Sequence, residues 1–179
     1  IENGQLKWYK DIIIKQLISY AMGCWMGRYR LDRPGLHIAH PNPTEQELQP
    51  YSINGKTFDI DDDGIVPLMD DDAPFPDNAE KLMKEFVEVV FGSDNKARNL
   101  DFINATLGRN TNIAKYLKTD FWKEHLTRYQ KRPIYWLFQS SRKNPAFQVL
   151  VYMHRMDAYT CEKVRTKYLL VYIEHLKNR

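Results

Sequence analysis

Two short runs of aromatic and β-branched residues near the end of the chain constrain its fold more than any other feature. Residues 134–138 (IYWLF) and 147–153 (FQVLVYM) each have the length of a strand, and a turn-rich segment separates them. Runs of this composition on either side of a turn are typical of a β-hairpin. The sequence therefore predicts a hairpin within residues 131–157, with Arg142 and Lys143 at its tip.

Most of the other segments have the three- and four-residue apolar spacing of helices. A helix is predicted over residues 8–26 on this ground. Another is expected after Asp77, which together with Glu80 resembles a capping box. Further helices are predicted over residues 95–107 and 111–129, and from the candidate N-cap Thr160 to the end of the chain.

These elements predict an α+β fold that is mainly helical, with a β-hairpin or small antiparallel sheet. A length of 179 residues suits one domain or two small ones. Because the chain begins at Ile1 rather than Met, we expect a single non-catalytic domain or fragment of a longer protein. The expected segments are a helix plus basic turn (1–40), an acidic loop region (41–76), helices (77–130), the hairpin (131–157) and a terminal helix (158–179).

Charge is distributed unevenly along the chain. Between Glu45 and Glu80 there are eleven acidic residues and one basic residue, whereas fourteen basic and five acidic residues follow from Lys115 onwards. Basic side chains in loops reach a phosphate backbone easily. The alternative is a solvated surface in which the two halves pair internally. The candidate DNA-binding residues are Arg28, Arg30 and Arg33 in the basic turn (residues 27–36), and Lys131, Arg132, Arg142 and Lys143 around the hairpin.

The acidic region contains a pattern that resembles a calcium loop. Asp59, Asp61 and Asp63 alternate before Gly64, and Asp70 stands at the twelfth position. Alternate carboxylates followed by glycine match the spacing of calcium loops, although such loops end on the longer glutamate. A solvated or arginine-paired acidic loop is the alternative. The apolar residues 65–69 are expected to be packed, and Asn54-Gly55 is a hairpin-turn signal.

No catalytic or cofactor-binding residue is predicted. The sequence contains no glycine-rich loop after a strand, no Asn/Asp-Pro-Pro-aromatic tetrapeptide and no P-loop, G-x-S-x-G or H-E-x-x-H motif. Cys24 and Cys161 form no C-x-x-C pair and are expected to be buried thiols in a reducing, cytoplasmic location. No apolar run approaches the roughly 20 residues that span a bilayer, so no membrane partner is expected.

Several blocks together resemble the PglX-type adenine-specific DNA methyltransferases. Residues 17–24 (LISYAMGC) and 27–36 (GRYRLDRPGL) are similar to the family's SYA-GC-GRYSLD-PGL block, with Arg30 where the family often has serine. Residues 131–138 (KRPIYWLF) match a second block. Three other stretches fit as well, namely residues 61–72 (DDDGIVPLMDDD), 151–155 (VYMHR) and 165–168 (RTKY).

The resemblance implies a parent enzyme that methylates the N6 atom of adenine in DNA with S-adenosylmethionine, in BREX phage defence or restriction–modification. The family's catalytic motifs lie upstream of these blocks, so no catalytic residue carries over and this chain alone is expected to be inactive. Two roles stay open for the region. It supports DNA binding within the enzyme, or it is a protein-interaction module that docks other defence-system proteins.

Overall fold

The computed structural model describes residues 8–70 and 72–179, and it confirms the hairpin. Strands β4 (Tyr135–Gln139) and β5 (Gln148–Tyr152) pair antiparallel, with Leu137 opposite Leu150. Strand β3 (Ile65–Pro67), which the sequence did not predict, pairs antiparallel with the other edge of β5, so the strand order is β3-β5-β4. The fold is therefore α+β and mainly helical, as expected.

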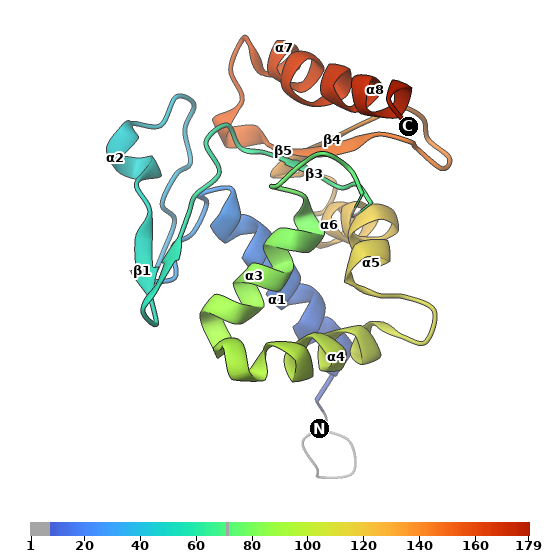
Figure 1. Cartoon of the computed structure of the whole chain (residues 1–179). Helices are drawn as coiled ribbons and strands as arrows, with labels where there is room; N and C mark the ends of the chain where they lie inside the picture. The colour runs from blue at the N-terminus through green and yellow to red at the C-terminus, as the bar shows by residue number, and fades with distance from the viewer. Residues whose placement is uncertain (1–7, 71) are drawn as a thin grey trace.

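The alternation of side chains along the hairpin divides the protein into two cores. Leu137 and Leu150 belong to the larger cluster, which lies among the helices. Val149 and Val151 belong to a smaller cluster beneath the C-terminal helix. Figure 1 shows the sheet between these two layers, with α7 and α8 on one side and α1, α3, α4, α5 and α6 on the opposite side. One face of the hairpin thus packs against the helical layer, and the other packs against the C-terminal helix.

The helical layer contains α1 (Lys10–Trp25), α3 (Ala79–Phe91) and α4 (Lys96–Leu107), with the short 3-10 turn η1 (Ser93–Asn95) before α4. The helix predicted over residues 111–129 is two helices, α5 (Ile113–Thr119) and α6 (Phe121–Arg128), which meet at Asp120.

The capping box predicted at Asp77 is wrong. The N-cap of α3 is Asn78, and no side chain caps the helix there. The Asn78 side chain instead accepts a hydrogen bond from the Met69 N–H at 3.2 Å and donates one to the Met69 carbonyl at 3.0 Å. Asn78 therefore ties the start of α3 to the segment that follows β3.

The acidic loop region expected over residues 41–76 contains regular structure. Helix α2 (Glu45–Leu48) begins with a capping box formed by Thr44 and Glu47. Strands β1 (Tyr51–Ile53) and β2 (Lys56–Phe58) form a second hairpin. Asn54 and Gly55 connect them with positive φ angles of 52° and 75°, the left-handed geometry that the Asn-Gly signal indicates.

The terminal helix begins one residue earlier than predicted and changes its hydrogen-bonding pattern along its length. It comprises α7 (Thr160–Lys163), the π-helical segment η3 (Val164–Leu169) and α8 (Leu170–Lys177), and a 3-10 turn, η2 (Met153–Arg155), precedes it. The N-cap position belongs to Tyr159, so the assignment of Thr160 was wrong.

Both cysteines are free, and Cys24 is buried as expected. Cys161 is exposed, which contradicts the prediction of a buried thiol. Its place in the first turn of α7 leaves it outside the face that packs on the sheet. Among the residues that the structure describes, no helix has the length and apolarity that crossing a membrane requires.

Candidate nucleic-acid interface

The basic turn holds its arginines in contacts within the protein. Arg28 is half-buried and donates from Nε to the Tyr29 hydroxyl and from Nη1 to the Tyr152 hydroxyl, both at 3.1 Å. The Tyr152 hydroxyl in turn donates to the Ile38 carbonyl at 2.7 Å. Arg28 therefore links the basic turn to strand β5 and is not free to contact a ligand.

Arg30 is also paired. Its guanidinium makes two hydrogen bonds to Asp32, at 2.9 and 2.7 Å, and lies 3.9 Å from the centre of the Tyr51 ring. The hydrogen bonds with Arg30 lower the pKa of Asp32, so the pair stays ionised. Arg33 is exposed, and its Nη2 lies 2.6 Å from His37 Nδ1. Of the three arginines in the basic turn, only Arg33 extends into solvent.

Lys131 and Arg132 lie between α6 and β4, and both are exposed. Lys131 has a positive φ of 61°, directly after Gln130 at 52°, so the backbone turns sharply here. Within the described residues neither side chain has a carboxylate partner. The structure therefore leaves both cations accessible, but it places them at the far end of β4 from the hairpin tip.

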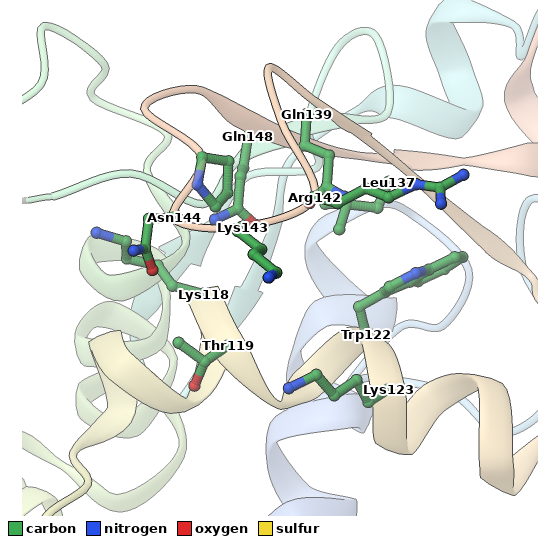
Figure 2. A pocket seen from close by; sticks show the side chains of 11 residues that line it. Lys118, Thr119, Trp122, Lys123, Leu137, Gln139, Arg142, Lys143, Asn144 and Gln148 are labelled. Atoms are coloured by element: carbon green, nitrogen blue, oxygen red, sulfur yellow. The ribbon is translucent and has the colours of Figure 1, made fainter.

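The hairpin tip borders a cavity of about 580 Å³, which we call the basic groove. One wall comes from α5 and α6 and the other from the β4–β5 hairpin, and Figure 2 shows side chains from both walls directed toward the space between them. Its lining includes Lys118, Trp122 and Lys123 on the helices, and Gln139, Arg142, Lys143 and Gln148 on the hairpin.

The four cations of the groove differ in their pairing. Lys118 Nζ lies 2.6 Å from an Asp70 carboxylate oxygen, and Lys123 Nζ lies 3.8 Å from one of Asp120. Arg142 and Lys143 are exposed and have no carboxylate partner in the part of the chain that the structure describes. The groove therefore carries a net positive charge, and its two unpaired cations lie at the hairpin tip.

Sequence reasoning identified Arg142 and Lys143 but missed the other lining residues. Lys118 and Lys123 lie on neighbouring helices, and nothing in their local sequence indicates that α5 and α6 face the hairpin. A signal for Gln139 and Gln148 was available. Once the hairpin register is fixed, these two residues are directly opposite each other and share a face of the sheet.

His125 supports the helical wall of the groove. It is 2% exposed and lies between aromatic rings, with Trp122 stacked at 5.8 Å between ring centres. Its Nε2 accepts a hydrogen bond from the Ile134 N–H at 3.1 Å, which places the ring proton on Nδ1. Burial, helped by the charges of Arg128 and Arg28, lowers the pKa of His125 to about 4. The ring is therefore neutral in the folded protein near pH 7.

Hydrogen bonds between side chains and main-chain groups hold the acidic loop in shape. One oxygen of Asp61 accepts hydrogen bonds from the N–H groups of Asp63, Gly64 and Ile65. Arg155 is 5% exposed and donates to the carbonyls of Asp61, at 2.7 Å, and Asp62, at 2.6 Å. These contacts explain the shape of the loop without an ion.

The structure brings together only part of the predicted calcium pattern. Carboxylate oxygens of Asp61, Asp62 and Asp63 lie within 4.8 Å of one another. Asp59 and Asp70 do not belong to this group, and Asp70 is paired with Lys118. Asp63 is further occupied by Lys167, whose Nζ lies 3.0 Å from Oδ2. Metal binding here stays a prediction.

Comparison with known proteins identifies relatives of the whole chain. It is 45% identical over 174 residues to the adenine-specific methyltransferase BrxX of Escherichia coli O9:H4 (strain HS), covering 90% of this chain and 14% of that protein. It is 43% identical over 164 residues to the adenine-specific methyltransferase PglX of Lacticaseibacillus casei (strain Zhang), covering 87% and 13%. No family model matches. The chain thus spans about one seventh of the length of these curated relatives.

Proposed function

This chain belongs, as one segment, to the PglX-type adenine-specific methyltransferases, and from that premise we propose that it is a non-catalytic region that supports DNA binding. In this proposal the parent enzyme methylates adenine in DNA as part of BREX phage defence, in the cytoplasm. The region lies downstream of the catalytic domain and helps to hold the DNA. The rest of the enzyme supplies the methyl transfer.

S-adenosylmethionine, the methyl donor that the family implies, does not fit the residues present here. Its site in such enzymes needs a glycine-rich loop after a strand, and the cofactors of α/β folds bind at the carboxyl ends of parallel strands. All strands described in this chain pair antiparallel, in sheets of two and three strands. We therefore assign the donor to another part of the parent enzyme.

The observation that carries the proposal is the basic groove. Arg142 and Lys143 stand at the hairpin tip without a carboxylate partner among the described residues, and Lys123 lines the same cavity from α6. Exposed cations that converge on a hollow fit a phosphate backbone, because each contact releases counterions from the DNA. Contacts of this kind position DNA without reading its sequence.

A salt titration of duplex binding tests the proposal. Replacing Arg142 and Lys143 with alanine should flatten the slope of log affinity against log salt concentration by about two, since each lost phosphate contact removes about one unit. The matched control replaces Arg98 and Arg109, two exposed arginines on and just after α4, at the opposite end of the molecule from the sheet (Figure 1). The control should keep the original slope.

An unchanged slope in the Arg142/Lys143 variant would remove the hairpin tip from the DNA path. The second candidate function, a module that docks other defence-system proteins, would then be preferred. One observation favours it independently: α8 exposes four large apolar side chains, each between 37% and 44% exposed. These are Leu170, Val171, Ile173 and Leu176.

A further inference from the structure

Ion pairs join the acidic segment, residues 45–80, to the basic segment that begins at Lys115, and one of these pairs lies at the basic groove. Among the described residues the pairs are Asp62 and Asp63 with Lys167, Asp72 with Arg179, and Asp70 with Lys118. Of these three cations, Lys118 is the one that lines the groove, from α5 on the wall opposite the hairpin (Figure 2). An acidic residue thus occupies one of the cations that DNA would meet in the groove.

We propose that Lys118 is a further DNA-contacting residue of the basic groove, and that Asp70 is the counter-ion that a DNA phosphate displaces from it. The inference rests on the proposed function, DNA contact through Arg142 and Lys143. It adds a third phosphate contact and an acid that weakens binding. In the free protein Asp70 neutralises Lys118. In the complex a phosphate takes the place of the carboxylate, which rotates into solvent.

The main chain holds Asp70 in a fixed position beside α5. The Asp70 carbonyl accepts hydrogen bonds from the Asn78 side-chain amide at 3.2 Å and from the Ala73 N–H at 3.0 Å. Asn78 is fully buried, and it also bonds both main-chain groups of Met69. These bonds fix the backbone of Asp70 independently of the ion pair. The carboxylate therefore stays within reach of Lys118 even while DNA is bound.

The carboxylate of Asp70 is free to move, in contrast to its backbone. The side chain is 73% exposed, and Lys118, with Nζ at 2.6 Å, is the one partner of the carboxylate within residues 8–70 and 72–179. Exposed ion pairs of this kind contribute little to stability, because water solvates both ions well when they separate. Separation of the pair is therefore easily offset when a phosphate replaces the carboxylate at Lys118.

The two lysines on the helical wall differ in how strongly they are expected to hold a phosphate. The Lys123 side chain is 76% exposed and lies 3.8 Å from Asp120, three residues before it in the chain. The Lys118 side chain is only 26% exposed. Salt and water screen a partly buried charge less than an exposed one. Lys118 is therefore the stronger site for an anion once Asp70 has moved away.

Three variants of the 179-residue chain test the exchange, with a fluorescently labelled duplex and anisotropy as the readout. Lys118→Gln should flatten the slope of log affinity against log salt concentration by about one. Asp70→Asn should strengthen binding roughly two- to fivefold at fixed salt, which is the factor that an exposed ion pair is typically worth. Asp72→Asn is the matched control, since it removes the same charge two residues away from an acid that pairs with Arg179. The control should leave the affinity nearly unchanged.

The direction of the Asp70 effect separates displacement from a structural role. If the pair only joins α5 to the segment after β3, then Asp70→Asn should leave binding unchanged or weaken it, and Lys118→Gln should keep the slope. Either result would overturn the inference. Equal strengthening by Asp70→Asn and Asp72→Asn would also overturn it, because the gain would then come from net charge alone.

These outcomes are distinct from those of the Arg142/Lys143 titration. If the Arg142/Lys143 variant flattens the slope and Lys118→Gln does not, the proposed function stands and the inference fails. If only Lys118→Gln flattens the slope, the helical wall contacts the DNA, and the role proposed for the hairpin tip fails instead. If neither variant changes the slope, both proposals fail.

Discussion

The basic turn and the hairpin tip have the same sequence character, since each places arginines or lysines in a loop beside aromatic residues. In the basic turn, Arg28 and Arg30 donate to hydroxyl and carboxylate groups of the protein itself. At the hairpin tip, Arg142 and Lys143 have no carboxylate partner among the described residues. The difference teaches that a cation in a loop indicates a ligand contact only when the fold leaves its hydrogen-bonding groups unused.

The largest effect is expected at Arg155, the most buried of the cations that the fold uses. Arg155 donates to the Met26 carbonyl, just before the basic turn, and to those of Asp61 and Asp62. Arg155→Met should lower the free energy of unfolding by about 3–5 kcal/mol, because it removes the donor from three main-chain carbonyls in a largely buried place. Urea denaturation measures this. A loss below 1 kcal/mol would show that these contacts are dispensable.

Acidification should weaken the wall of the basic groove through His125. The pKa of the folded residue is about 4, against an ordinary value of 6.5. The stability that the neutral ring contributes is therefore complete above pH 6.5, and it is lost as the pH falls toward 4, because only the unfolded chain takes up the proton. We expect a loss of roughly 2–3 kcal/mol over this range.

Denaturation curves between pH 7 and pH 4 test the role of His125 when repeated with His125→Gln, which keeps an acceptor but does not titrate. This variant should show a flatter dependence on pH. If both proteins respond identically, other groups govern the acid sensitivity.

Replacing Arg28 should lower the stability of the fold by a smaller amount and should not affect DNA binding. Arg28→Met removes the hydrogen bonds to the Tyr29 and Tyr152 hydroxyls and should destabilise the fold by about 1–2 kcal/mol. The salt slope of duplex binding should not change, since the side chain is already engaged. A slope reduced by one would mean that Arg28 contacts DNA and that the contrast between the two regions is wrong.

The smallest effect is expected at Arg33, the exposed arginine of the basic turn. Arg33→Ala should change stability by less than about 0.5 kcal/mol, as is usual for exposed turn residues. The same variant also tests whether the basic turn contacts DNA. A salt slope that stays constant confines phosphate contact to the groove, whereas a decrease of about one unit would add the basic turn to the DNA path.

Local patterns predicted the elements whose signals lie within a few residues. The hairpin followed from two strand-length runs, and the turn at Asn54-Gly55 from its dipeptide. Strand β3 was missed because its three residues are too short to show a period, and its partner is distant in the sequence. Asn78 replaced Asp77 at the start of α3 because a tertiary contact with Met69, absent from any local pattern, fixes its side chain.

The candidate site was predictable only in part, for a related reason. Charge and loop position identified Arg142 and Lys143, but equally selected Arg28 and Arg30, whose partners come from distant segments or from the geometry of the turn. That Gln148 lines the groove depends on where β5 lies relative to α5 and α6, which no local pattern contains.

The pairing of β3 with β5 has a consequence for how the chain is synthesised. The two strands are separated by 80 residues, so on the ribosome β3 emerges long before its partner. At a synthesis rate of about 5–20 residues per second, the apolar segment that contains β3 waits roughly 4 to 16 seconds with an open edge. The central sheet must therefore be completed late, after most of the helices have left the exit tunnel. Nascent chains stalled before residue 148 should be cleaved by protease near residues 65–67. Protection at that stage would show that another segment packs against β3 before β5 is synthesised.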